Sequence, residues 1–441
     1  MTRPVDTPDE ARVPRIVTGI LGLIAVATVA TGLTIHHQSG KLGTASPPFV
    51  MGWMPHVDAL WLAAAILVAA LVTFGAGRFL GAELDPRVVA GALFVAALAL
   101  GLAVNAARAG THAWWEPYDL QGGLARTNAI NEYLPGLPTL DDGVRNYLDR
   151  FAEVVPSQSV NVAGHPPGPL VLAKALGATT AQGMAALVIL LGACCAPLAH
   201  RLALQFSSGE REARLAGVLA ACSPGLILIG VTSFDFAYAA FGALAALGLC
   251  ARSRGGRILG GLAFAVASLM SWALLGVGAW AAIAVWRRDG WRAAFEVALI
   301  AGFGVAAVQG GLAAWAGYDP IGTLHATEQV YRDSLARLRP YAFWLFGSPV
   351  AWGLMAGPAI VAGAARGALR GWAPAVALVI IVAVAAIGGF TKAETERIWL
   401  FMVPLACVAA APALARWRTA PLLGGLLAQA LALSILMNTV W

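Results

Sequence analysis

The sequence predicts an all-α polytopic membrane protein with about 11 full transmembrane helices and one re-entrant or half-length helix pair. Apolar residues make up 59% of the 441 residues and charged residues only 12%, too little charge to cover a soluble domain of this size. Apolar stretches long enough to cross about 30 Å of hydrocarbon recur along the whole chain. Arginines stand in small groups between these stretches, which is the pattern of topology signals.

The apolar stretches define the expected crossings. We expect them at about 16–35, 57–77, 88–107, 181–200, 214–232, 236–251, 293–315, 343–364, 372–389, 398–415 and 420–440. The five cysteines all lie inside such stretches, where we expect buried small residues rather than disulfides or metal ligands. The net charge is +6, but the arginines form no single basic face, so nucleic acid is not an expected partner.

Residues 258–286 need a different arrangement. This uncharged stretch lies between Arg257 and Arg287, is too long for one simple crossing, and is interrupted by Ser268, Ser271 and Gly276. The positive-inside rule places both arginine-rich ends in the cytoplasm, so we expect two short helices that turn back within the membrane. With that hairpin the arginine groups fall on one side, with the N-terminus cytoplasmic and the C-terminus external. Because the basic residues are almost all arginine and Ala, Gly, Val and Leu are abundant, we expect a bacterial plasma membrane.

The chain divides into three segments. Residues 1–107 form an N-terminal three-helix segment, residues 108–180 an external loop with amphipathic and interfacial helices, and residues 181–441 the remaining bundle. Within the loop, the spacing of apolar residues over 141–155 predicts an amphipathic helix with Asp141 as its N-cap. A short interfacial helix is expected at 170–178.

Polar residues recur at separate positions on the predicted external side. Besides the long loop they are found at Ser233-Phe234-Asp235, over 317–340 and over 391–397. Ionisable groups at a membrane boundary are costly unless they are paired or used. These clusters therefore predict a shared polar cavity on the external face.

The arrangement resembles the GT-C superfamily of membrane glycosyltransferases. The resemblance rests on the long carboxylate-rich loop, the His165-Pro166-Pro167-Gly168-Pro169 run that closes it, the half-length pair at 258–286, and the late Glu394-Thr395-Glu396-Arg397-Ile398-Trp399 loop. It implies transfer of a sugar, with inversion, from a polyprenyl-phosphate donor to an envelope glycan, glycolipid or protein. The loop after the first helix, 36–57, lacks the family's carboxylate, and two extra N-terminal helices would explain the displacement.

Such a reaction needs a carboxylate to deprotonate the acceptor and cations to stabilise the departing phosphate. For catalysis we expect Glu132 first, then Asp141 and Asp142, Asp119 and Asp235. For the donor phosphate we expect His165, Lys392 and Arg397, supported by Tyr133, Glu394 and Glu396. Each has a structural alternative: a solvated loop carboxylate, a helix cap, a chain reversal or an ion pair. Arg332, Arg337 and Arg339 are candidates for lipid headgroups. No histidine or cysteine spacing predicts a metal site, and a divalent cation is left open.

Other functions fit parts of the pattern. A transporter or flippase of lipid-linked intermediates would share the membrane topology, but such proteins usually show internal repeats, and none is visible here. A ligase or polymerase of lipid-linked glycans would share the sidedness and the charged loops. A non-catalytic relative would explain the displaced acidic loop.

Overall fold

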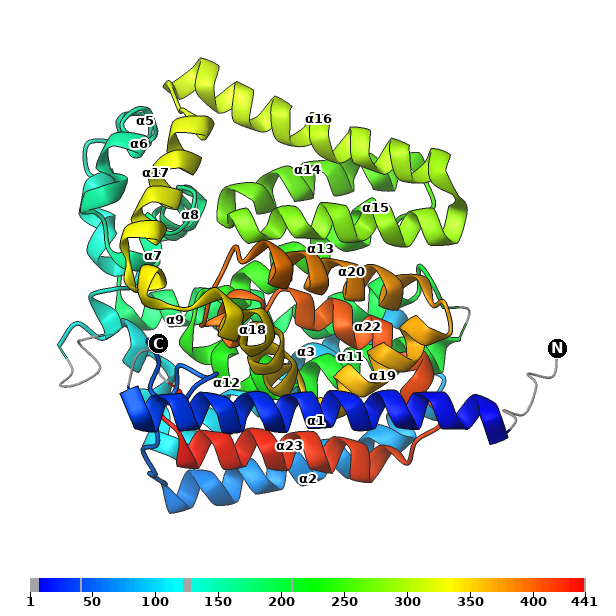
Figure 1. Ribbon diagram of the computed structural model, residues 1–441. Coiled ribbons are helices and arrows are strands. Elements are labelled where there is room, and N and C mark those ends of the chain that lie inside the picture. Colours follow the sequence, from blue (N-terminus) through cyan, green and yellow to red (C-terminus); the bar gives the residue numbers. More distant parts are fainter. Residues whose placement is uncertain (1–7, 40–41, 122–127, 208, 440–441) are drawn as a thin grey trace.

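The computed structural model describes residues 8–39, 42–121, 128–207 and 209–439. It is 79% helical and contains no strand among these residues, which confirms the all-α class. The long helices run side by side along one axis, with short helices gathered at one end (Figure 1). We call this end, formed by residues 42–58, 108–121, 128–180, 317–340 and 389–399, the loop end.

The helices of the bundle follow the apolar stretches of the sequence. They are α1 (Pro8–Ser39), α2 (Ala59–Gly81), α3 (Pro86–Ala109), α9 (Ala181–Ala193), α10 (Cys195–Ala203), α11 (Glu210–Cys222), α12 (Pro224–Thr232), α13 (Asp235–Leu249), α14 (Arg254–Met270), α15 (Leu275–Asp289), α16 (Trp291–Ala316), α18 (Tyr341–Ala356), α19 (Pro358–Leu369), α20 (Ala373–Gly388), α22 (Met402–Leu414) and α23 (Thr419–Leu436).

Within the described part of the chain, six helical segments are long and apolar enough to cross a membrane, or up to eight if two bent pairs each form one span. This is fewer than the predicted number. The apolar helices α13, α20 and α22 have only 15, 16 and 13 residues, short of the roughly 20 needed for a full crossing. Large apolar side chains stand exposed, including Leu23 (69%), Phe74 (75%) and Phe303 (77%). These features are consistent with a multi-pass membrane protein.

Two of the expected crossings are bent. The axes of α11 and α12 differ by 50°, and those of α18 and α19 by 110°. Each second helix begins with a proline, Pro224 or Pro358, which has no N–H for the preceding turn. Gly357 between α18 and α19 has φ of 112°, a conformation that side chains other than glycine rarely adopt.

The hairpin predicted over 258–286 is present as α14 and α15. They are separated at Ser271 and the short helix η5 (Trp272–Leu274). The tip packs so closely on Gly168 that a Cβ there would overlap the carbonyl group of Leu269. Gly248 of α13 and Gly260 of α14 likewise bring their backbones into contact, as small residues do between membrane helices.

The 108–180 segment is built of short helices. They are η1 (Gly110–Trp114), η2 (Glu116–Tyr118), η3 (Leu134–Leu140), α5 (Val144–Asp149), α6 (Phe151–Val154), η4 (Val155–Ser157), α7 (Val160–Ala163) and α8 (Gly168–Ala175). The expected interfacial helix after the proline run is α8. The remaining short helices of the loop end are α17 (Pro320–Asp333), η6 (Leu335–Leu338) and α21 (Thr395–Ile398).

The helix predicted over 141–155 is divided into α5, α6 and η4. Its expected inward face is buried at Tyr147, Leu148, Phe151 and Val155, as the spacing indicates. Asp141 is not its N-cap. Gly143 occupies that position and has no side chain that could cap the helix. Its φ of 94° turns the chain into α5.

Candidate functional site

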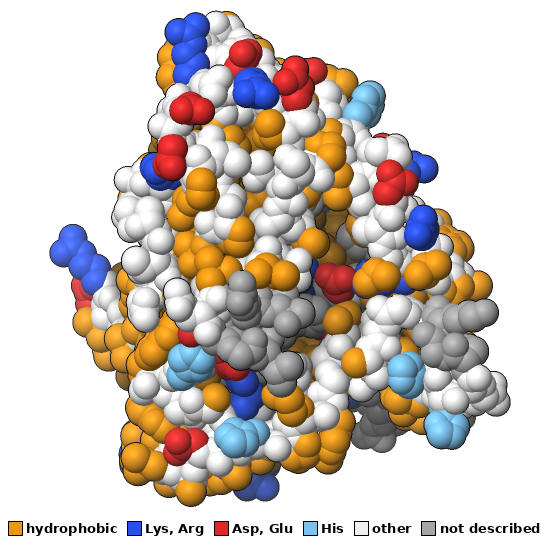
Figure 2. All heavy atoms as spheres, turned by 90° about the vertical axis from the view of Figure 1, so that its left-hand side faces the viewer, with side chains coloured by type: hydrophobic (Ala, Val, Ile, Leu, Met, Phe, Trp, Pro, Cys, Tyr) orange, Lys and Arg blue, Asp and Glu red, His pale blue; other side chains and the backbone are white. Residues whose placement is uncertain are grey.

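Segments that are far apart in the sequence meet at the loop end. They contain residues 131–133, 159–165, 233–238, 331–339 and 391–399, and the polar contacts between them define the candidate site. Figure 2 views this end and shows a recess where acidic and basic side chains lie next to each other among hydrophobic ones.

Glu132 is buried at the centre of this site, with 1% of its surface exposed. The side-chain amide of Asn161 donates a hydrogen bond of 2.6 Å to Oε1 of Glu132, while Oε2 is buried and has no partner among the described residues. Ser159 donates to the backbone oxygen of Glu132 at 2.6 Å. The Glu132 carboxylate, although it belongs to a loop, is therefore buried. It is fixed by Asn161 of α7 and by Ser159, the N-cap residue of α7.

Arg397 joins three separate segments. Its guanidinium lies 3.3 Å from the Asp235 carboxylate, 3.3 Å from Oδ1 of Asn161 and 3.0 Å from the Glu394 carboxylate. The second oxygen of Glu394 pairs with Arg339 at 2.8 Å, and Arg339 also donates to the backbone oxygen of Lys392 at 2.6 Å. Two arginines and two carboxylates thus alternate in one buried network.

The chain before α21 adopts an unusual conformation. Ala393 and Glu394 have φ of 67° and 59°, the left-handed region that costs free energy for residues other than glycine. The conformation turns Glu394 toward both arginines. Strain of this kind is often found at functional sites.

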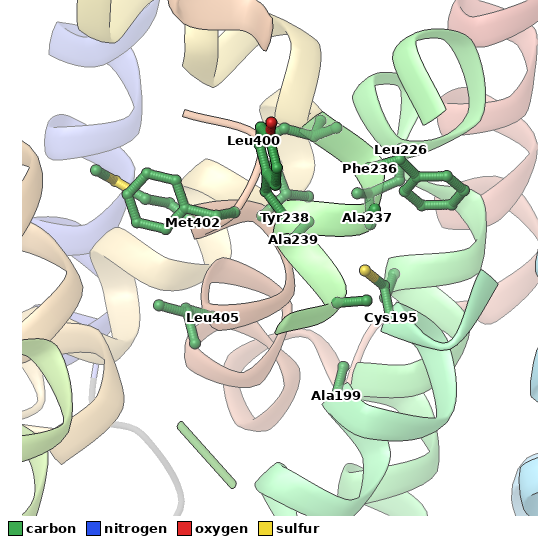
Figure 3. Close-up of a cluster of buried hydrophobic side chains, with 14 of the residues drawn as sticks. Cys195, Ala199, Leu226, Phe236, Ala237, Tyr238, Ala239, Leu400, Met402 and Leu405 are labelled. Atoms are coloured by element: carbon green, nitrogen blue, oxygen red, sulfur yellow. The ribbon is translucent and has the colours of Figure 1, made fainter. Parts of the chain in front are cut away.

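Aromatic hydroxyls form the other wall. The hydroxyl of Tyr133 contacts that of Tyr238 and lies 3.2 Å from Nδ1 of His165. The rings of His165 and Tyr238 are 5.1 Å apart. Apolar packing around the start of α13 fixes Asp235 and Tyr238. Figure 3 shows that this packing involves Cys195, Ala199, Leu226, Phe236, Ala237, Ala239, Leu400, Met402 and Leu405.

Lys392 lies half-buried beside the network. Its backbone N–H donates to the hydroxyl of Tyr331 at 2.8 Å. Its ammonium group makes neither a hydrogen bond nor an ion pair with any described residue. Lys392 therefore joins the network through its backbone, and no described residue neutralises its ammonium group.

Glu396 lies next to the network but points to another segment. Its Oε1 accepts a 2.7 Å hydrogen bond from the backbone N–H of Val50, and its Oε2 is buried without a partner among the described residues. This contact joins the 42–58 loop to α21.

Burial shifts the proton affinities of these loop groups. It raises the pKa of Glu132 to about 8, against the lowering effects of Arg397 and Asn161. Burial also raises the pKa of Glu396 to about 7. The pKa of His165 is lowered, mainly by burial and despite the nearby Asp235 charge. Glu132 is therefore largely protonated and His165 largely neutral at pH 7.

The structure brings together six of the expected site residues, which are Glu132, Tyr133, His165, Asp235, Glu394 and Arg397. Glu396 lies beside them. Lys392 borders them. Asp119 instead bonds His112 at 3.2 Å, Asp141 pairs with Lys174 at 2.8 Å, and Asp142 is exposed. These three acids lie outside the network, and a catalytic role for them stays a prediction.

Three residues of the network were not expected there. Asn161 bridges Glu132 and Arg397, Tyr238 bonds Tyr133, and Arg339, expected at lipid headgroups, is buried and paired with Glu394. Tyr238 lies three residues after Asp235 and thus nearly one helical turn away, a spacing that could have indicated it. Asn161 and Arg339 have no comparable signal in the sequence.

Among the described residues, no group of three or more His, Cys, Asp or Glu side chains is placed to hold a metal ion. Comparison of the chain with protein-family models, curated proteins and solved structures finds no match in any of the three.

Proposed function

We propose that this chain is a membrane glycosyltransferase of the GT-C type. It moves a sugar, with inversion, from a polyprenyl-phosphate donor to an envelope glycan, glycolipid or protein. The loop end faces the exterior of a bacterial plasma membrane, and the short helices α13, α20 and α22, the bent pairs and the α14–α15 hairpin complete about eleven crossings plus one pair.

One observation supports this proposal above the others. A buried carboxyl group whose pKa lies near neutral pH, Glu132, is joined through Asn161 to the buried Arg397. Acid–base catalysis is most effective when the pKa lies near the working pH. A departing phosphate also needs a cation in place before the bond breaks.

The charge balance of the site favours an anionic ligand. Asp235 and Glu394 offset Arg397 and Arg339, and Glu132 is largely uncharged at pH 7. Lys392, whose backbone bonds Arg339 and Tyr331, adds a cationic residue at the edge of the network. A phosphate group carried on a lipid can approach from the membrane and neutralise this charge.

The position of the charges favours an enzyme over a transporter. The charged network lies at the loop end rather than midway along the helices. Transporters usually place their substrate site near the membrane midplane between two repeats. A ligase of lipid-linked glycans shares the same site chemistry and differs only in the size of the transferred group.

The test is transfer of radiolabelled sugar by the purified protein from a panel of polyprenyl-phosphate sugars, with membrane lipid extract as acceptor. We expect Glu132→Gln to lower transfer about 100-fold or more, and Lys392→Gln and Asp235→Asn to weaken it. Glu153→Gln is the matched control, because Glu153 is an exposed acid of the same loop. Absence of transfer by the unmodified protein with every donor would overturn the proposal and favour a transporter.

A further inference from the structure

His165 has a hydrogen-bonding arrangement that fixes its proton. Its Nδ1 lies 2.7 Å from the backbone oxygen of Asn161. A carbonyl oxygen can only accept, so Nδ1 must be the donor and must have the hydrogen. In the neutral ring the lone pair is therefore on Nε2.

The second ring nitrogen is available to a ligand. Nε2 of His165 has no hydrogen-bond partner among the described residues, and it is not one of the buried unpartnered atoms. It is thus a basic atom of a half-buried side chain that is neither paired nor fully enclosed. A neutral Nε2 would repel a phosphate oxygen, since both atoms present lone pairs, but it accepts a hydrogen bond from a hydroxyl or amine.

Glu132 has the opposite character. Its Oε2 is buried and unpartnered, and Asn161 already donates to Oε1. Donation by Asn161 leaves Oε2 as the oxygen that holds the acid proton. A buried O–H group without an acceptor is unfavourable until a ligand supplies one.

The charged and titratable groups around His165 come from several elements. Asp235 on α13 raises its pKa and Arg397 on α21 lowers it. The neutral hydroxyl of Tyr133 lies 3.2 Å from its Nδ1, and the ring of Tyr238 packs 5.1 Å from its ring. Burial outweighs the Asp235 charge. Two neighbouring groups whose environments move their pKa values apart are a common basis for acid and base roles.

We propose that His165 is the base and Glu132 the acid of the transfer reaction, acting on an acceptor that is a neutral alcohol or amine. This inference rests on the proposed function. In one step, the acceptor proton passes to Nε2 of His165 while the acceptor oxygen or nitrogen bonds to the anomeric carbon. The bond from that carbon to the phosphate oxygen breaks, and the Glu132 proton passes to the departing lipid phosphate. Afterwards, His165 returns its proton to water and Glu132 takes one from water.

The pH dependence of transfer separates this assignment from one with Glu132 as the base. With His165 as base, kcat/KM falls on the acid side only below the ordinary histidine pKa, because burial lowers the pKa of His165. It falls again above about pH 8, where Glu132 loses its proton. With Glu132 as the base, kcat/KM would instead rise as the pH increases through about 8. A rise there would overturn the inference while leaving the glycosyltransferase function in place.

A substitution tests the same point without removing the structural hydrogen bond. The side-chain amide of Asn resembles Nδ1–H, so His165→Asn keeps a donor for the Asn161 oxygen but lacks a basic Nε2. We expect at least a 100-fold loss of transfer in a variant that unfolds at the same temperature as the unmodified protein. His56→Asn, at an exposed histidine of the loop end, is the matched control. Retained transfer in His165→Asn would show a structural role only.

A readout independent of transfer comes from diethylpyrocarbonate, which reacts with unprotonated imidazole nitrogens. Mass spectrometry of the intact, purified protein should find His165 modified at pH 6.5. Addition of an alcohol acceptor that supports transfer should protect it. If His165 does not react, its Nε2 is not accessible to a ligand and the inference is overturned. If unmodified protein transfers no sugar from any donor, the proposed function fails and this assignment fails with it.

Discussion

Arg397 determines how the candidate site holds together at the scale of single residues. It is buried, and it contacts Glu394 of its own segment together with Asp235 and Asn161 from two distant segments. A buried ion pair adds little net stability compared with apolar residues. Removal of one partner is costly, however, because the other charge stays buried without compensation.

We therefore expect Arg397→Gln to lower the free energy of unfolding by about 3–5 kcal/mol. The double variant Asp235→Asn, Arg397→Gln should regain part of that loss, since no lone charge remains at this position. Unfolding of the detergent-solubilised protein, followed by intrinsic fluorescence, measures both. Equal stability of the single and double variants would show that Asp235 is solvated in the absence of Arg397.

Glu132 predicts a pH dependence of stability. Its pKa is about 8 in the folded protein, compared with an ordinary value of 4.5. Between these values the folded state binds more protons than the unfolded state, so stability falls as the pH rises from about 4.5 through about 8. The unfolding temperature should show this decline, and Glu132→Gln should reduce it. An unchanged slope would assign the decline to other groups, with Glu396→Gln as the first comparison.

Residue identity predicted only part of this site. The sequence predicts Glu132, Asp235 and Arg397 as site residues because they are ionisable groups in predicted loops, which depends only on residue type and topology. Burial of Glu132 depends on how α7 folds over it, and no local pattern encodes that contact. The same reason explains why Asn161 and Arg339 were not expected. Their partners are 29 or more positions away in the sequence.

At the scale of elements, glycines determine how closely the helices around the hairpin approach. A Cβ at Gly260 of α14 would overlap the backbone of Gly248 and Leu249 on α13, and this backbone cannot move aside as a side chain would. On α16, a Cβ at Gly302 would meet no atom within 4 Å. These positions form a matched pair of mid-helix glycines.

We expect Gly260→Ala to destabilise the protein by about 1–3 kcal/mol, as overpacking does in other cores. Gly302→Ala should leave stability unchanged or slightly raise it, because alanine favours the helix. Thermal unfolding of both variants in the same detergent makes the comparison. Equal effects would mean that α13 and α14 separate without cost.

The hydropathy pattern predicted the positions of most apolar helices, because an apolar stretch between charged groups has few alternatives to a helix in a membrane. The hairpin break at Ser271 was predicted from its polar interruption and its flanking arginines. The bends before Pro224 and Pro358 were not, although proline is a known cause of bends. In an apolar run, proline alone does not distinguish a kinked crossing from a chain that turns away.

At the scale of the whole molecule, polar segments from every part of the chain meet at one end. The 42–58 loop reaches α21 through Val50 and Glu396, and the hairpin tip reaches α8 at Gly168. A bundle with this arrangement has one end with the buried polar network and one end where arginines gather. The proposed orientation follows from that difference.

Cysteine labelling in intact cells tests both the orientation and the hairpin. In a background without the five native cysteines, Cys replaces Glu153 and Arg337 at the loop end and Arg254 and Arg292 at the other end, all exposed positions. A membrane-impermeant maleimide should label positions 153 and 337 in intact cells, and positions 254 and 292 only after permeabilisation. If the stretch between Arg254 and Arg292 crossed the membrane once, one of these two positions would react in intact cells. Labelling of both position 254 and position 292 in intact cells would reverse the orientation. The candidate site would then lie in the cytoplasm, where an externally exposed acceptor could not reach it.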